Sequence, residues 1–264
     1  MREEKVKKIV RKGYAKLAKS ERSCCTSEMT QKIGYSKKEL ESVPEGATFS
    51  LGCGNPIALA SLREGETVVD LGSGGGLDCF LAANKVGEKG HVIGVDMTPE
   101  MLDKARENLR KSKHKNVEFR LGEIENLPVA NNTADIIISN CVINLSPNKK
   151  RVFDETFRVL KPGGRLMISD IVLLKELPEK VKKNVESYIG CVSGAEMKAK
   201  YLDLIKQAGF QGVTIVEESH IPMDFVVDDP TARRVMRETG TTLEDAKKFS
   251  GSVASIKVSG QKPR

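Results

Sequence analysis

Cys141 stands where a buried strand is expected to end, within the stretch ISNCVINLSP at residues 138–147. The preceding run ADIII indicates a buried strand, and Ser146-Pro147 is a loop signal. In open α/β sheets, ligands bind in the crevice outside the carboxyl ends of the strands. A thiolate is a soft ligand that selects soft, thiophilic centres. The sequence therefore predicts a thiol, rather than a base or a carboxylate, at a ligand site.

The chain has five further cysteines: Cys24, Cys25, Cys53, Cys79 and Cys191. No pair has the CxxC spacing of a structural zinc site. The N-terminal segment MREEKVKKIVRKGY lacks the apolar core of a secretory signal, and no apolar run approaches the roughly 18 residues of a membrane helix. We therefore expect a cytoplasmic protein with reduced thiols and no membrane partner.

The net charge of +7 does not indicate a nucleic-acid partner, although nucleic-acid binding is one interpretation of a basic chain. Lys and Glu are mixed along most of the expected helices, and a chain with no Trp and four Tyr has no visible base-stacking platform. A solvated, lysine-rich surface is the simpler interpretation.

A glycine-rich loop, VVDLGSGGG at residues 68–76, follows the first expected strand. Gly72 and Gly74 allow a tight turn and a close approach to a ligand. Asp70 precedes them, so the pattern is D-x-G-x-G-x-G and not the dinucleotide fingerprint G-x-G-x-x-G. Asp96 closes the second strand, where a carboxylate can accept hydrogen bonds from ribose hydroxyls. Glu123 follows the third strand, where an adenine amino group could be met.

Loop, ribose acid and adenine-side acid together resemble the class I S-adenosylmethionine-dependent methyltransferases. In that family the loop holds the methionine part of the cofactor. The resemblance implies S-adenosylmethionine as cofactor and a set of cofactor-binding residues: Asp70, Gly72, Gly74, Asp96, Met97, Glu123 and Ile124. A dinucleotide-binding or cofactor-free Rossmann fold is the alternative.

Short β-branched runs alternate with amphipathic helical patterns from residue 67 onward, which predicts βαβ units and a parallel sheet. Strands are expected at 67–73, 91–96, 117–122, 134–140 and 164–172, with helices near 77–87, 99–112, 149–160, 178–190 and 195–208. Two later strands, at 213–219 and 252–262, are expected to form an antiparallel pair at the sheet edge. The predicted fold class is α/β: a Rossmann-like class I methyltransferase sheet, mostly parallel with an antiparallel edge strand and helices on both faces.

The sequence also suggests a division of the chain. Residues 1–45 are polar and helical in pattern, and are expected to form an N-terminal cap over the carboxyl edge of the sheet. Residues 46–264 form the expected S-adenosylmethionine-binding domain, which carries a mostly helical insert at about 220–250.

The acceptor of the methyl group is indicated by what surrounds Cys141. Oxygen and nitrogen acceptors usually lose a proton to a general base, yet the three histidines lie at strand ends or in a lysine-rich loop. Trivalent arsenic binds two or three thiolates and keeps a lone pair, which can attack a sulfonium methyl group with no proton to remove. A site with thiols and no evident base therefore suits arsenic.

At this point the resemblance becomes specific. The segments LGCGNP, DLGSGGGLDCF, GVDMTPEML, LGEIENLPV, ISNCVINLSP, LKPGGRLMISDIV and YIGCVSGA are similar to those of the arsenite S-adenosylmethionine methyltransferases. The likeness implies that Cys141 and Cys191 hold the trivalent arsenical. It implies that Cys53 also handles the substrate and takes part in redox turnover with an N-terminal thiol, Cys25 or Cys24. Cys79 is expected to be a small hydrophobic residue of the core.

The resemblance also implies partners. Arsenite or methylated trivalent arsenicals would be the substrates. Methylation leaves arsenic formally pentavalent, so two electrons must return, for instance as Cys53 and Cys25 form a disulfide that glutathione or thioredoxin then reduces. The alternatives are a class I methyltransferase for a small organic acceptor, a non-catalytic arsenite-binding protein, and a nucleic-acid methyltransferase.

Overall fold

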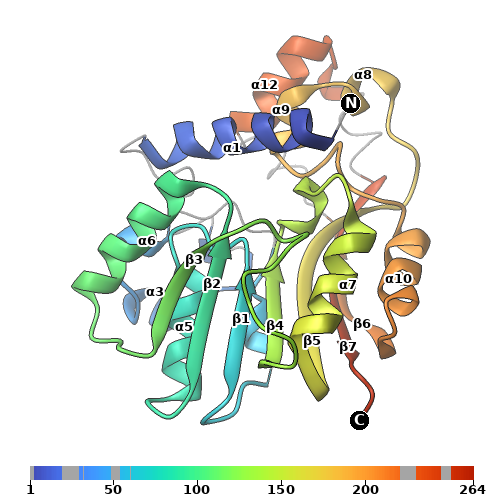
Figure 1. The fold of residues 1–264 in the computed structure, drawn as a ribbon. Coiled ribbons are helices and arrows are strands. Elements are labelled where there is room, and N and C mark those ends of the chain that lie inside the picture. The colour runs from blue at the N-terminus through green and yellow to red at the C-terminus, as the bar shows by residue number, and fades with distance from the viewer. Residues whose placement is uncertain are drawn as a thin grey trace.

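The computed structural model describes residues 3–19, 30–31, 33–48, 54–59, 61–220, 230–244 and 251–264. Its centre is one seven-stranded sheet in the order β3-β2-β1-β4-β5-β7-β6 (Figure 1). The strands are β1 Thr67–Leu71, β2 His91–Asp96, β3 Val117–Leu121, β4 Ala134–Asn140, β5 Leu160–Leu173, β6 Gln211–His220 and β7 Val253–Gln261. The first five are parallel, and β7 runs antiparallel to both β5 and β6. The predicted fold class is confirmed.

Helices cover both faces of this sheet. One face packs against α4 Pro56–Leu59, α5 Leu77–Val86 and α6 Pro99–Lys111. The other packs against α7 Lys149–Val159 and α10 Lys198–Gln207. In β4, Ile136 and Ile138 face the first layer and Ile137 faces the second, which explains why the strand is apolar at consecutive positions. Among the described residues, no helix is long and apolar enough to cross a membrane.

The structure differs from the sequence-based prediction after β5. The helical stretch expected over about 178–190 is helical but interrupted, because the chain forms two short helices there, α8 Glu179–Lys182 and α9 Val185–Ile189. Asn184 lies between them, and its Oδ1 accepts a hydrogen bond from the Ser187 amide at 2.8 Å. This is the hydrogen bond of an N-cap residue, so Asn184 caps the start of α9. Farther on, α12 Pro230–Thr239 lies within the range of the expected insert.

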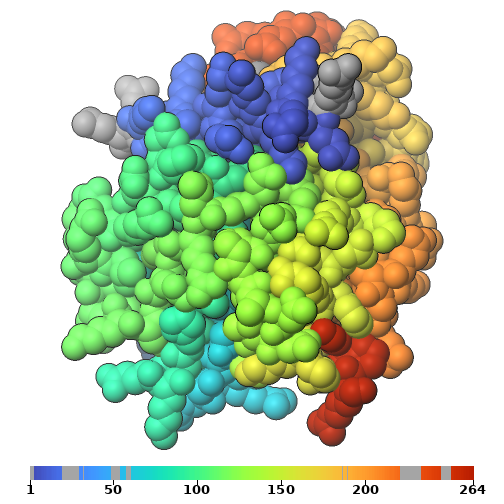
Figure 2. Space-filling view, viewed as in Figure 1, coloured from blue at the N-terminus to red at the C-terminus, as the bar shows by residue number. Residues whose placement is uncertain are grey.

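The α1 helix, Glu3–Lys19, lies across the carboxyl ends of the strands (Figure 1). In the space-filling view it forms a blue band over the upper edge of the sheet (Figure 2). The short helix α3 Lys37–Glu41 begins with a capping box between Ser36 and Glu39, and the 3-10 turn η1 Glu45–Ala47 follows. The division into a cap of residues 1–45 and a domain of residues 46–264 stays a prediction.

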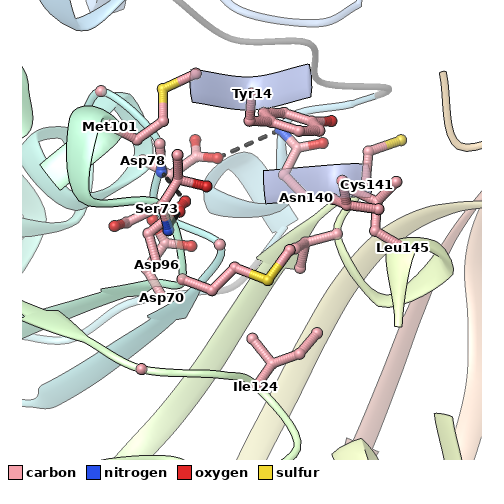
Figure 3. Close-up of a pocket in the computed structure, with 18 of the residues that line it drawn as sticks. Tyr14, Asp70, Ser73, Asp78, Asp96, Met101, Ile124, Asn140, Cys141 and Leu145 are labelled. Carbon is pink, nitrogen blue, oxygen red and sulfur yellow. Dashed lines mark hydrogen bonds between the residues drawn. The ribbon is translucent and has the colours of Figure 1, made fainter. Parts of the chain in front are cut away.

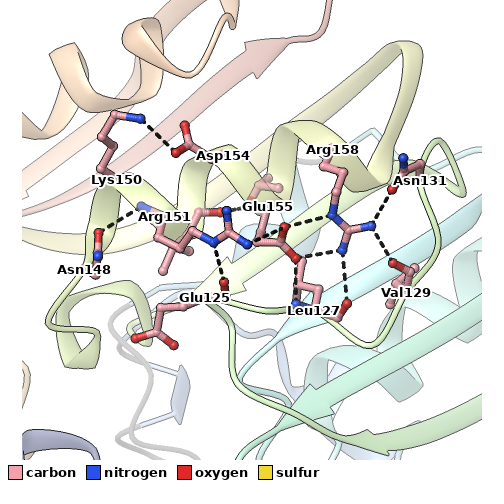
Figure 4. A network of polar contacts seen from close by, with 12 residues as sticks. Glu125, Leu127, Val129, Asn131, Asn148, Lys150, Arg151, Asp154, Glu155 and Arg158 are labelled. Carbon is pink, nitrogen blue, oxygen red and sulfur yellow. Dashed lines mark hydrogen bonds and ion pairs between the residues drawn. The ribbon is translucent and has the colours of Figure 1, made fainter. Parts of the chain in front are cut away.

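An ion-pair network holds the loop after β3 against α7 (Figure 4). The buried carboxylate of Glu155 accepts hydrogen bonds from Arg158 and from the Leu127 amide, at 2.7 and 2.9 Å. Arg158 also donates to the carbonyls of Leu127 and Val129. Arg151 of α7 also donates to the Glu125 carbonyl at 3.1 Å, so the network helps to hold Glu125 in place.

Candidate active site

A pocket opens at the carboxyl edge of the sheet, between the strand ends below and α1 above (Figure 3). It is bordered by the glycine loop after β1, the end of β2, the loop after β3 and the end of β4. The residues that line it include Lys7, Val10, Tyr14, Asp70, Gly72, Ser73, Gly74, Asp78, Asp96, Met97, Ile124, Glu125, Asn140, Cys141 and Leu145. The pocket therefore brings together several residues that the sequence singled out on three separate strands.

Gly72 and Gly74 both adopt positive φ, +69° and +51°, in the turn that leaves β1. A Cβ on Gly72 would lie 2.4 Å from a methyl group of Val142, so the turn has no room for a side chain there. A Cβ on Gly74 would meet no atom within 4 Å. Gly72 thus permits close packing of the chain on itself, whereas Gly74 leaves its surface open to a ligand.

Asp96 links the end of β2 to the glycine loop. Its Oδ2 accepts a hydrogen bond from the Gly74 amide at 3.0 Å, and its Oδ1 accepts one from the Thr98 amide at 2.8 Å. Burial raises the pKa of Asp96, and these backbone amides oppose the rise. The carboxylate is therefore fixed in orientation and still lines the pocket.

Two further carboxyl groups face the same pocket. Asp78 is held by the Tyr35 hydroxyl at 2.7 Å and by the Asn140 amide at 3.3 Å. Burial raises the pKa of Asp70 well above its usual range, and the charge of Asp78 adds to the shift. Three buried acids in one cavity repel one another, so the pocket favours a positively charged ligand.

The remaining expected cofactor residues differ in whether they line the pocket. Met97 and Ile124 line the pocket, but Glu123 is not among the lining residues. The Glu123 carboxylate instead pairs with Lys7 and Arg11 of α1, at 2.7 and 3.3 Å. Glu125, two residues on, does line the pocket, and it accepts a hydrogen bond from the Ser146 hydroxyl at 2.6 Å.

Cys141 and Cys191 meet at the far end of the pocket from the glycine loop. Cys141 lines the pocket, and the Cys191 thiol lies directly behind it, donating to the Cys141 carbonyl at 2.9 Å. Both cysteines are buried and both have positive φ, +54° and +64°. This conformation is uncommon for residues other than glycine, and such strained positions cluster at functional sites.

The loops that carry the two cysteines are fastened together. A Cβ on Gly194 would lie 2.2 Å from the Asn144 carbonyl, so only glycine allows the loops to approach this closely. The Tyr188 hydroxyl donates to the Leu145 carbonyl at 3.2 Å. The Asn144 amide donates to the buried Asp170, at 2.8 Å, on β5. The close approach to Asn144 explains Gly194, the second glycine of the YIGCVSGA motif.

The electrostatic surroundings of Cys191 are mixed. Burial raises the pKa of its thiol, and the charge of Asp170 adds to the rise. A hydrogen bond from Tyr14 and the charge of Lys149 act in the opposite direction. Lys149 is itself half-buried, and it donates to the Ser146 carbonyl at 3.1 Å.

The other cysteines have different positions. Cys79 is a free thiol in the core, fully buried, where it donates to Asp70 at 3.2 Å. The expectation that every cysteine is reduced does not hold at Cys141, which is disulfide-bonded in this structure. The predictions for Cys24, Cys25 and Cys53 fall outside the described residues.

Sequence reasoning missed several residues at the site, among them Tyr14, Asp78 and Lys7. Asp78 was visible in the segment DLGSGGGLDCF, but nothing local shows that it faces Asp70. Lys7 and Tyr14 share one face of α1 by their spacing of seven residues, yet the spacing alone does not say what that face covers.

S-adenosylmethionine suits this pocket by its charge and by its polar groups. Its ammonium and sulfonium charges match the buried acids Asp70, Asp78 and Asp96. The Ser73 hydroxyl lines the pocket and is buried without a hydrogen-bond partner in the part of the chain that the structure describes, so it is available to a ligand. The open surface of Gly74 adds space beside it.

Comparison with known proteins agrees with this geometry. Residues 62–209 match a family model described as a methyltransferase domain. An arsenite methyltransferase of Aquipseudomonas alcaligenes is 35% identical over 91% of this chain and 68% of its own length. The chain belongs to the arsenite methyltransferase family.

Other arsenite methyltransferases give the same result. The protein of Halobacterium salinarum is 46% identical over 85% of this chain, and the chain spans 62% of that relative's length. The crystal structure of an arsenic(III) S-adenosylmethionine methyltransferase from Chlamydomonas reinhardtii superposes with a TM-score of 0.64 at 32% identity. The match covers 88% of this chain and 71% of the algal one.

Proposed function

We propose that this protein transfers methyl groups from S-adenosylmethionine to trivalent arsenic held by cysteine thiolates. The observation that carries the proposal is the contact between Cys191 and Cys141, since Cys141 lines one end of a pocket whose other end is the glycine loop. Family membership supports the same activity, because the relatives are named arsenite methyltransferases.

The cofactor end of the pocket would bind and orient the methyl donor. Gly72 lets the loop pack closely, and Gly74 leaves its surface open to the cofactor. Asp96 would accept hydrogen bonds from ribose hydroxyls. Asp70 and Asp78 would face the positive charge of the cofactor. When bound, S-adenosylmethionine would supply an electrophilic methyl group that an arsenic lone pair can attack, and the bond to the cofactor's sulfur would break with no proton to remove. These residues therefore contribute proximity and alignment.

The acceptor end would bind the arsenical through sulfur. Each As–S bond forms as a thiol proton and an arsenic hydroxyl leave together as water. No histidine lines the pocket among the described residues, and arsenic needs no general base because it keeps its lone pair. We expect Cys53 to supply a further sulfur, as the family resemblance implies.

Turnover would need a thiol reductant such as glutathione or thioredoxin. Arsenic that has given its lone pair to a methyl group is formally pentavalent, and it regains two electrons as two thiols form a disulfide and release two protons. The family resemblance assigns this redox pair to Cys53 and Cys25 or Cys24. Because Cys141 is itself disulfide-bonded in this structure, the reductant would also restore its thiol before arsenic binds.

The test is an assay with arsenite, S-adenosylmethionine and a thiol reductant, in which methylated arsenic is separated by chromatography and quantified by elemental detection. We expect wild type to produce methylated arsenic and Cys141→Ser to produce none, with S-adenosylhomocysteine binding retained by both. Full activity of Cys141→Ser would overturn the role of this thiol. If wild type binds S-adenosylhomocysteine but methylates no arsenic, the acceptor is a different molecule.

A further inference from the structure

One face of α1 forms the roof of the pocket. Lys7, Val10 and Tyr14 all line the cavity, and their spacing of three and four residues places them on the same side of the helix. Lys7 lies toward the cofactor side, where its ammonium pairs with Glu123 at 2.7 Å and lies 3.6 Å from Glu125. The roof is thus a continuous helical face rather than a loop.

Tyr14 belongs to the acceptor end of this roof. Its side chain packs against the apolar cluster that contains Cys141, Cys191 and Leu145, and it hydrogen-bonds the Cys191 sulfur. The close-up shows the tyrosine ring above Asn140, with its hydroxyl pointing to the side of the pocket where Cys141 lies (Figure 3). A residue of α1 therefore touches a thiol that is 177 positions away in the sequence.

The helix that carries Tyr14 is fixed along its length. Besides the Lys7 pair, Lys19 pairs with Glu100 on α6 at 3.0 Å, and Glu3 accepts a hydrogen bond from the Asn148 amide, before α7, at 3.4 Å. Val6 and Val10 are buried beneath it. With its two ends and its centre attached to different elements, α1 holds the Tyr14 side chain in one place.

We propose that Tyr14 is a positioning residue of the arsenic site, whose hydroxyl orients the Cys191 sulfur toward the arsenic bound beside Cys141. The proposal rests on the proposed function. The Cys191 thiol donates a hydrogen bond to the Cys141 carbonyl, and the Tyr14 side chain, which packs on the same cluster, also hydrogen-bonds its sulfur. When the As–S bond forms, the thiol proton leaves with an arsenic hydroxyl as water. Tyr14 keeps its own proton, and its hydrogen bond then holds the sulfur against rotation away from the pocket.

The test variant is Tyr14→Phe, which removes one oxygen and keeps the ring that packs on the cluster. We expect the dissociation constant for methylarsenite and the KM for arsenite to rise roughly three- to tenfold, as is typical for the loss of one hydrogen bond. The kcat, the affinity for S-adenosylhomocysteine and the thermal unfolding midpoint should change little. A general loss of structure would instead move all of these quantities.

Lys12→Gln is the matched control. It changes an exposed side chain on the face of the same helix opposite to Val10 and Tyr14, and it leaves the Tyr14 hydroxyl in place. We expect its effect on methylarsenite affinity to be less than about twofold. Equal losses in the two variants, or no loss in Tyr14→Phe, would overturn the proposal.

The proposed function can fail separately in the same experiment. Wild type that binds methylarsenite but produces no methylated product would contradict methyl transfer to arsenic, and the binding comparison would still decide the role of Tyr14. Wild type that binds no trivalent arsenical would overturn both.

Discussion

The thiol of Cys191 donates a hydrogen bond to the backbone carbonyl of Cys141, with 2.9 Å between sulfur and oxygen, although the two residues are 50 positions apart. Both have left-handed backbone conformations, which cost free energy for residues with a side chain. Strain of this kind persists only where the surrounding contacts determine it. Here the close packing of Gly194 on the Asn144 carbonyl and the hydrogen bond from Tyr188 to Leu145 fasten the two loops together.

The first prediction concerns Cys191. Replacement by serine exchanges a soft sulfur ligand for a hard oxygen, so we expect arsenite methylation to fall by about 100-fold, or about 2.7 kcal/mol of transition-state stabilisation. Binding of S-adenosylhomocysteine, measured by calorimetry, should be unchanged because Cys191 is behind Cys141 and is not among the residues that line the pocket.

Ser187→Ala is the control for this loop. The Ser187 hydroxyl is buried and has no hydrogen-bond partner within the described ranges, so its removal should leave methylation within about twofold of wild type. An active Cys191→Ser enzyme would remove this residue from the arsenic site.

The second prediction compares two glycines of one loop. Gly74→Ala should cost about 1 kcal/mol of unfolding free energy, because φ is positive but no atom lies within 4 Å of the new methyl group. That methyl group would enter the cofactor space and weaken S-adenosylhomocysteine binding by about tenfold or more. Gly72→Ala should instead lower stability by about 3 kcal/mol, because its Cβ meets Val142 at 2.4 Å.

Urea unfolding and calorimetric titration of both variants measure these effects. Undiminished binding by a folded Gly74→Ala protein would show that the open surface of Gly74 does not face the cofactor.

The third prediction concerns the network between α7 and the loop after β3. Glu155→Ala leaves Arg158 without its carboxylate and the buried Leu127 amide without an acceptor, so we expect a loss of about 3 kcal/mol in unfolding free energy. Asp154→Ala, one residue earlier, breaks only a more exposed pair with Lys150 and should cost about 0.5 kcal/mol. Chemical denaturation of the two variants compares these values, and similar losses would contradict the assignment.

The fourth prediction is a pH dependence. Burial raises the pKa of Asp170 to about 7, above the value of about 3.9 for an unfolded chain, while hydrogen bonds from Tyr201 and the Ile171 amide oppose the rise. The folded state therefore binds the proton of Asp170 more tightly than the unfolded chain does. Protonation of Asp170 thus stabilises the fold, and this stabilisation is lost as the pH rises toward 7. Asp170→Asn removes this titration.

As the pH rises from about 5 to about 8, wild type should lose about 2 kcal/mol of unfolding free energy that Asp170→Asn does not lose. Denaturant titrations at the two pH values measure the change. Asp203→Asn, on the exposed side of α10, is the control and should follow the wild-type profile. A parallel profile for Asp170→Asn would mean that this carboxyl does not titrate in the folded state.

Local patterns were sufficient for the sheet and for the positions of residues along it. Apolar runs, the glycine loop and the acid at the end of β2 predicted the parallel strands and placed Asp70, Asp96 and Cys141 at one edge. These features depend on backbone conformation and on burial of neighbouring residues, which a short stretch of sequence specifies. The break between α8 and α9 was missed because the side chain of Asn184 overrides the apolar periodicity of that segment.

Contacts between distant segments were decided only by tertiary structure. The approach of Cys191 to Cys141 depends on the close packing that Gly194 allows, and the position of Tyr14 over Cys191 depends on where α1 is attached. Likewise, Glu123 pairs with Lys7 rather than lining the pocket, since a nearby cation on α1 attracts its carboxylate. Residue types predict what a side chain can bind, but the partner within reach depends on how the elements pack.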